Sequence, residues 1–121
     1  IDLDIIYEDE YLIVINKPSG LVVHPGNGIA KGTLVNGLVF HFSQLSSLNN
    51  LRPGIIHRLD KETSGVILIA KDNETHFKLS KQFENREITK VYRAFVWGNI
   101  NNNGLIKGLL IEIEKIEQHL F

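Results

Sequence analysis

A strongly polar stretch with apolar sequence on both sides constrains this chain more than any other feature. Residues 57–65 read His-Arg-Leu-Asp-Lys-Glu-Thr-Ser-Gly, so five of the first six side chains are charged or can carry a charge. Two isoleucines precede the stretch, and the apolar run 66–70 follows it at once. Because unpaired charges are costly to bury, we expect a loop between two extended segments. On spacing alone, a solvated turn closed by residues 63–65 is favoured over a functional site.

The remaining apolar segments predict several strands. Residues 5–7 and 11–15 are expected to be two strands joined by an acidic turn. The second is a continuous apolar run, which is typical of a strand covered on both faces. Residues 21–23 are expected to form another short extended piece, after Lys-Pro-Ser-Gly interrupts the ladder. Residues 88–97 alternate between two sets of side chains, and this predicts a long strand.

Two helices are expected, each with a capping residue at its start. Thr33 precedes apolar positions spaced by three and four, so it is a candidate N-cap with a core-facing stripe behind it. His41 lies off that stripe and should be exposed. Asp72 is the candidate N-cap of the second helix. Its inner face is expected to carry small and aromatic side chains: Phe77, Ser80 and Phe83.

Composition bounds the chain to one small domain with a modest core. It has 121 residues and no cysteine, which excludes disulfides and thiolate metal sites and suits a reducing cytoplasm. No run is long enough to cross a membrane, and the chain begins with Ile, as expected of a piece of a longer protein. His24 has no second ligand at metal spacing, so we expect a structural contact with backbone. The net charge is −1, but residues 1–16 carry −5 and residues 52–93 carry nine basic against six acidic side chains, a net +3. A basic central face for RNA is therefore possible.

Four segments in order resemble the motifs of RluA-type RNA pseudouridine synthases. They are residues 16–25 (Asn-Lys-Pro-Ser-Gly-Leu-Val-Val-His-Pro), 52–55 (Arg-Pro-Gly-Ile), the charged stretch 57–65, and 90–98 (Lys-Val-Tyr-Arg-Ala-Phe-Val-Trp-Gly). The resemblance covers residues 7–98. It implies part of that family's catalytic domain, an α+β fold with a mixed, mainly antiparallel sheet and two helices packed against it. The whole chain, 1–121, is expected to be this single partial domain.

The resemblance also implies a reaction and its residues. Such enzymes isomerise uridine in RNA to pseudouridine without metal or cofactor, and ribosomal RNA is favoured over transfer RNA as substrate. Asp60 matches the family's nucleophilic carboxylate. Arg58 matches the arginine that fills the space of the flipped base and contacts phosphate, and Tyr92 matches the tyrosine that stacks on that base. Lys17 lies in a matched motif but receives no chemical role.

The end of the chain departs from the family. Residues 105–121 lack the Ile-x-Arg-x-x-x-x-Arg segment and the later strand whose arginine pairs with the catalytic carboxylate in the family. Back-translating residues 109–121 with A- or T-ending codons and shifting the register by one base restores the first of these segments. We therefore expect an out-of-frame tail, and an inactive remnant with at most weak RNA binding is the alternative function. A small glycosidase pairing Asp60 with Glu62 is disfavoured, because no sugar-binding aromatic cluster flanks the loop.

Overall fold

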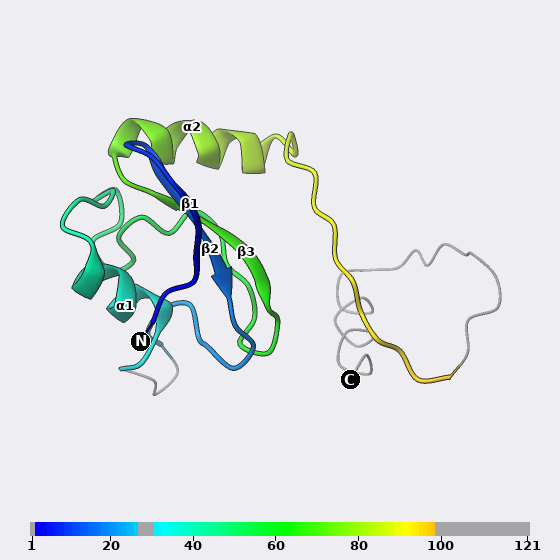
Figure 1. Ribbon diagram of the computed structural model, residues 1–121. Coiled ribbons are helices and arrows are strands. Elements are labelled where there is room, and N and C mark those ends of the chain that lie inside the picture. The colour runs from blue at the N-terminus through cyan, green and yellow to red at the C-terminus, as the bar shows by residue number, and fades with distance from the viewer. Residues whose placement is uncertain (1, 27–30, 99–121) are drawn as a thin grey trace. The chain divides into compact units, whose positions relative to one another are not determined.

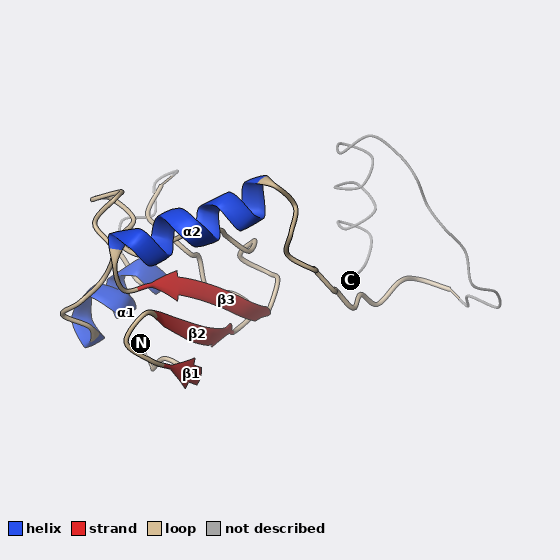
Figure 2. Ribbon diagram, turned by 90° about the horizontal axis from the view of Figure 1, so that it is seen from above, coloured by secondary structure: helices blue, strands red, loops and turns tan. Residues whose placement is uncertain are grey.

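The computed structural model describes residues 2–26 and 31–98, so the tail discussed above lies outside the described residues. The chain divides into two units, the first ending at Ile88 and the second beginning at Thr89. In chain order the elements of the first unit are β1 (Ile5–Glu8), β2 (Leu12–Lys17), α1 (Leu34–His41), β3 (Gly65–Ala70) and α2 (Asn73–Glu84), shown in Figures 1 and 2. The expected α+β class is confirmed, and both strand pairs of this unit are antiparallel.

The sheet has the order β1-β2-β3, with β2 in the centre. Ile13 pairs with Ile69 and Ile15 with Ile67, so these four side chains share one face and are almost fully buried. On the opposite face of β2, alternate side chains are only partly buried or exposed. The expectation that both faces of this strand are covered is therefore wrong. A hydrophobic run alone does not reveal that only one side has a layer of side chains packed on it.

Helix α1 covers the buried face of the sheet. Thr33 is its N-cap as predicted: the Thr33 hydroxyl accepts from the Asn36 amide, and the Asn36 side chain accepts from the Thr33 amide at 2.9 Å. Leu34 and Leu38 pack with the sheet isoleucines and Val23 in the core. Residues 21–23, expected to be a short extended piece, lie outside the strands of the sheet. The carbonyls of residues 22 and 23 accept hydrogen bonds from the first amides of α1, which have no partner within a helix.

Helix α2 begins after Asp72, whose carboxylate accepts from the Thr75 amide at 2.7 Å, as predicted for an N-cap. Both views show α2 alongside β3 (Figures 1 and 2). Its inner face is only partly as expected. Phe77 is 59% exposed, and the buried residue is His76, which shares a face with the partly buried Ser80 and Phe83. The spacing of four and then three residues from His76 defines this face, and Phe77 lies one residue off it.

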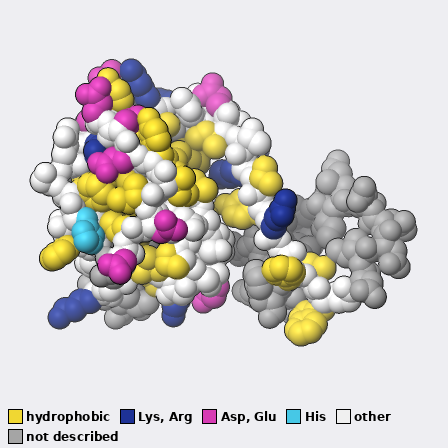
Figure 3. Space-filling model, in the orientation of Figure 1, with side chains coloured by type: hydrophobic (Ala, Val, Ile, Leu, Met, Phe, Trp, Pro, Cys, Tyr) yellow, Lys and Arg dark blue, Asp and Glu magenta, His cyan; other side chains and the backbone are white. Residues whose placement is uncertain are grey.

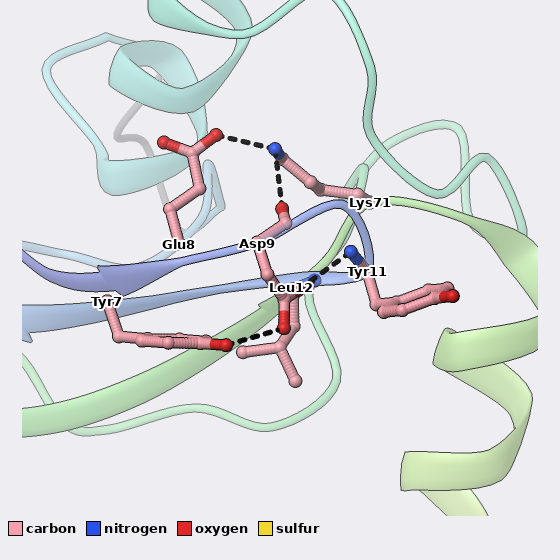
Figure 4. Close-up of polar contacts among 6 residues, drawn as sticks. All are labelled: Tyr7, Glu8, Asp9, Tyr11, Leu12 and Lys71. Carbon is pink, nitrogen blue, oxygen red and sulfur yellow. Dashed lines mark hydrogen bonds and ion pairs between the residues drawn. The ribbon is translucent and has the colours of Figure 1, made fainter.

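The turn between β1 and β2 is built on Asp9 (Figure 4). One Asp9 carboxylate oxygen accepts from the amides of Tyr11 at 2.8 Å and Leu12 at 2.9 Å. The backbone amides of Leu12 and Tyr11 hold the pKa of Asp9 below its usual value. Lys71, just beyond β3, forms an ion pair with Glu8 and donates to the Asp9 carbonyl at 2.8 Å. The acidic turn is thus fastened to the end of β3.

Residues 89–98, the described part of the second unit, do not form the predicted strand. A β-strand is completed by hydrogen bonds to a neighbour, and the described part of this unit contains no partner strand. The alternating apolar side chains of the segment stay exposed: Val91 is 83% exposed, Phe95 82% and Trp97 83%. Alternation of side chains alone therefore did not identify a strand in this segment.

Candidate active site

The charged loop, residues 57–64, leaves the sheet beside β3. Just before it, Ile55 forms an isolated antiparallel bridge with Ile69, and the Ala70 amide donates to the Gly54 carbonyl at 2.9 Å. Gly54 has φ +77°, and a Cβ at this position would lie 2.8 Å from the Ala70 carbonyl oxygen. Only glycine fits this close approach of the two backbones. The glycine of the Arg-Pro-Gly sequence therefore allows the backbone to lie directly against the edge of β3.

His57 accepts the next hydrogen bond that the edge of β3 donates. The Leu68 amide donates to Nε2 of His57 at 3.0 Å. The imidazole ring also stacks on Phe83 of α2, with ring centroids 4.6 Å apart and planes 24° from parallel. The start of the loop is thereby held between β3 and α2.

Lys17 holds the other side of the loop. It is the last residue of β2 and is completely buried, and its Nζ donates to the carbonyls of Pro18 (2.9 Å), Leu21 (2.7 Å) and Lys61 (3.0 Å). Burial lowers the pKa of the Lys17 ammonium, while the nearby carboxylates of Glu62 and Asp60 act in the opposite direction. Three backbone oxygens replace the water that a buried ammonium loses.

Sequence reasoning gave Lys17 no role, although a signal for it was present. Lys17 has the same strand parity as Ile13 and Ile15, so it points to the buried face of β2. A lysine at an inward position must find hydrogen-bond acceptors inside the protein. The motif around it supplies two further contacts to the loop: the Gly20 amide donates to the Lys61 carbonyl at 2.7 Å, and the Ser19 hydroxyl donates to the Glu62 carbonyl at 2.7 Å.

The structure places two of the three expected site residues in this loop. Arg58 and Asp60 are both exposed, and between them Leu59 is buried and anchors the loop. The Thr63 amide donates to the Asp60 carbonyl at 3.1 Å, which closes a turn directly after the carboxylate. Tyr92 belongs to the second unit and is 63% exposed there, so its approach to Asp60 stays a prediction.

A pocket of about 230 Å³ adjoins the loop. Arg58, Leu59 and Lys61 line it together with residues 22–24 and 26, so both neighbours of Asp60 in the chain, Leu59 and Lys61, are in its wall. Nδ1 of His24 lies 3.2 Å from the Pro25 carbonyl, which agrees with the expected backbone contact, and its Nε2 is buried without a hydrogen-bond partner. Arg58 and Lys61 thus bring basic groups to a pocket whose lining includes both chain neighbours of Asp60.

Charge on the first unit is unevenly distributed. Figure 3 shows Asp and Glu side chains among apolar ones on the face seen in Figure 1, with Lys and Arg mainly at its margins. This agrees with the surplus of acids in residues 1–16. Among the described residues, no three His, Asp or Glu side chains are grouped closely enough to hold a metal ion. The described helices are also too short or too polar to cross a membrane.

The first unit is thus an antiparallel α+β unit that presents an exposed aspartate on a loop anchored at both ends. Comparison with known proteins is more specific, because the family model of RNA pseudouridylate synthases matches residues 11–119. The chain belongs to this family. An uncharacterized RNA pseudouridine synthase of Aquifex aeolicus is 51% identical over 104 residues, which are 85% of this chain and 33% of that protein.

Two further similarities agree with this assignment. Ribosomal large subunit pseudouridine synthase D of Pseudomonas aeruginosa is 46% identical over 106 residues, 88% of this chain and 32% of that protein. The solved structure of human RNA pseudouridylate synthase domain containing 1 has a TM-score of 0.66 at 25% identity, covering 84% of this chain and 35% of that one. The chain thus spans about a third of the length of the relatives it matches.

Proposed function

We propose that this chain carries the uridine-isomerising loop of an RNA pseudouridine synthase, with Asp60 as the nucleophile. The observation that carries the proposal is the position of Asp60 in the charged loop. Its side chain is exposed, while the backbone on either side is held by the hydrogen bond to His57 and by the contacts of Lys17 and Gly20 with Lys61. A reactive group that is exposed yet rigidly supported is what nucleophilic catalysis requires.

The proposed chemistry is a balanced isomerisation. The carboxylate of Asp60 attacks the uridine or stabilises the cationic sugar as the bond from C1′ to N1 breaks. The uracil turns within the site, and its C5 forms the new bond to C1′. The proton on C5 then leaves to a base, and N1 gains a proton from solvent. No electron is transferred and no atom is lost, so Asp60 and a proton acceptor are sufficient.

Arg58 and Tyr92 complete the proposed site. The uridine must leave the stacked RNA before Asp60 can reach it, which costs about a few kcal/mol. The exposed guanidinium of Arg58 can stack in the vacated space and pair with phosphate, which a lysine does less well. Tyr92, once it is brought to the loop, would stack on the extruded uracil and assist removal of the C5 proton. The basic pocket beside Asp60 suits the RNA backbone on either side of that uridine.

The substrate we propose is ribosomal RNA, acted on in the cytoplasm. The Pseudomonas aeruginosa relative is named for the large ribosomal subunit, and the sequence is 46% identical to it. The alternative is a chain that binds RNA without turnover, an incomplete catalytic domain whose last residues are out of frame. The exposed apolar side chains of residues 91–97 favour this alternative, because in a complete sheet such a segment would be paired and covered.

Release of tritium from large-subunit ribosomal RNA carrying 5-tritiated uridine tests the proposal. The chain is expected to release label, and Asp60→Asn should reduce the rate by at least about a thousandfold. Glu62→Gln is the matched control, since it removes a carboxylate two residues away in the same loop and should retain activity. Release that survives Asp60→Asn excludes Asp60 as the nucleophile. If only a chain with its reading frame restored after residue 108 releases label, the inactive alternative is correct.

A further inference from the structure

We infer that His57 is a positioning residue. Its imidazole ends the backbone hydrogen bonding along the edge of β3 and so sets the point at which the charged loop leaves the sheet. The inference deepens the proposed function and rests on it only for the consequence at Asp60. It assigns a role to the first residue of the charged loop, a residue that is not needed for the chemistry of the carboxylate itself.

The register along the edge of β3 shows what His57 replaces. Gly54 is hydrogen-bonded to Ala70, and Ile55 is bridged to Ile69. In an antiparallel ladder the next pair is Ile56 with Leu68, and the Leu68 amide would donate to the Ile56 carbonyl. Among the described residues, that amide instead donates to Nε2 of His57 at 3.0 Å. A side chain thus takes the place of a backbone acceptor.

This replacement has a consequence for the path of the chain. If the ladder continued, residues 57–60 would run flat along β3 with their backbone paired to it. With the imidazole satisfying the Leu68 amide, the backbone after Ile56 is free to turn away from the sheet while no strand amide is left without an acceptor. Asp60 follows three residues later, in the exposed turn closed by Thr63.

The ring itself is held in place. It stacks on Phe83 with ring centroids 4.6 Å apart, so α2 fixes the plane in which Nε2 presents its lone pair. The Leu68 amide is a donor, so Nε2 must be unprotonated, and a neutral ring then carries its proton on Nδ1. The geometry therefore assigns one tautomer, and that tautomer can be measured without any assay of turnover.

Two variants distinguish the effect of the hydrogen-bond acceptor of His57 from the effect of its aromatic ring. His57→Phe retains an aromatic ring for Phe83 but has no acceptor, whereas His57→Gln places an amide oxygen near the position of Nε2. We expect hydrogen exchange of the Leu68 amide to become about tenfold faster in His57→Phe and to return toward the parent rate in His57→Gln. His41→Gln, at an exposed histidine of α1, is the matched control and should leave the Leu68 rate unchanged.

A local change must be distinguished from general loss of stability. The amides of Phe42 and His76, which donate to Leu38 and Asp72 in the two helices, should keep their exchange rates in both His57 variants. The nitrogen chemical shifts of His57 in the parent chain should show an unprotonated Nε2. A proton on Nε2, or an unchanged Leu68 rate in His57→Phe, overturns the inference, and so does a rate change shared equally by all three amides.

Tritium release gives the functional consequence. His57→Phe should lower kcat far more than it raises KM for the RNA, and His57→Gln should recover most of kcat, because the loop is misplaced while its RNA contacts persist. A kcat that is the same in His57→Phe and the parent contradicts the positioning role. If the parent chain has no turnover, the proposed function fails, while the exchange rates and the tautomer still decide whether His57 holds the loop.

Discussion

Lys17 shows how a single buried charge can organise a loop. Its side chain is completely buried, and its ammonium bonds to three carbonyl oxygens, which belong to its own turn and to the charged loop. Pro18 and Leu21 are near it in sequence, whereas Lys61 is 44 positions away. The interaction therefore joins two segments whose proximity no local pattern predicts. Lys17 therefore supports the candidate site through its hydrogen bond to the backbone carbonyl of Lys61.

Replacing Lys17 by methionine should destabilise the fold and loosen the loop. Lys17→Met keeps the length and most of the volume of the side chain but removes the ammonium donor from three carbonyls, of which that of Lys61 still accepts from the Gly20 amide. We therefore expect a loss of about 3 kcal/mol in the free energy of unfolding. Urea denaturation measures this change. Lys78→Met is the matched control, because Lys78 is exposed on α2 and forms a solvent-exposed ion pair with Glu74. Equal midpoints for Lys17→Met and the parent would contradict the proposed clamp.

At this scale, the sequence supports a hypothesis about which residues carry the chemistry, but it does not show what holds them. The run from His57 to Gly65 marks Asp60 and Arg58 through the resemblance to the family, and the structure exposes both. The hydrogen bonds of Lys17 and His57 depend on which backbone atoms meet across the sheet. Spacing along a sequence says nothing about such contacts, although the inward parity of Lys17 was a usable sign.

Among the elements, α2 is fastened by a polar cluster around the buried side chains of Ser46 and His76. Ser46 Oγ lies 2.7 Å from His76 Nδ1 and 3.0 Å from Asn73 Oδ1, and the Ser47 amide donates to the same Asn73 oxygen at 2.8 Å. Since Asn73 Oδ1 is the acceptor, the Ser46 hydroxyl donates to it, and the His76 Nδ1–H donates to the Ser46 oxygen. The cluster ties the segment before the charged loop to the start of α2.

This cluster makes stability depend on pH. Burial lowers the pKa of His76 below its ordinary value of 6.5. Between the lowered native pKa and 6.5, His76 holds more protons in the unfolded chain than in the native one, so its contribution to stability falls as the pH decreases through this window and is constant above it. His76→Gln should reduce that loss, as measured by the urea midpoint between about pH 8 and about pH 5.

The exposed histidine of α1 provides the control for this prediction. His41→Gln removes an imidazole of the same type from an exposed position and should leave the pH dependence of the parent chain in place. If the two variants lose the same amount of stability on acidification, the buried cluster is not the source of the effect. If His76→Gln and the parent chain have the same profile, His76 does not titrate across this window in the way its burial requires.

Helices were easier to predict from the sequence than strands. Thr33 and Asp72 cap their helices through local hydrogen bonds, which depend only on residues a few positions away. Strands depend on partners that are distant in sequence: residues 21–23 became acceptors for α1, and residues 88–97 have alternating side chains but no ladder. Distant contacts also explain why Phe77 is exposed, although it was expected on the inner face of α2. The segment that α2 packs against determines which of its side chains are buried.

For the molecule as a whole, the comparisons give the sequence a context that its own residues do not supply. The family model matches residues 11–119, and the chain covers about a third of the length of the relatives it matches. In the first unit a core of isoleucines, valine and leucines forms between the sheet and α1, so this part of the fold has its own packing. Residues 89–98 are different, because Val91, Phe95 and Trp97 remain exposed. Their alternation suits a strand that needs a neighbour.

The hypothesis that residues 88–97 form a strand when a partner strand is present can be tested through Trp97, the single tryptophan of the chain. Its side chain is 83% exposed, so its fluorescence should resemble that of tryptophan in water and be readily quenched by acrylamide. A chimera joins residues 1–98 to the carboxyl-terminal part of the Aquifex aeolicus relative, with any tryptophans of the added part changed to phenylalanine. If residues 88–97 pair as a strand there, the emission of Trp97 shifts to shorter wavelength and quenching decreases, because burial removes the indole from water. A folded chimera that leaves both signals unchanged would show that alternation in this segment does not reflect a strand, and that its apolar side chains serve another contact.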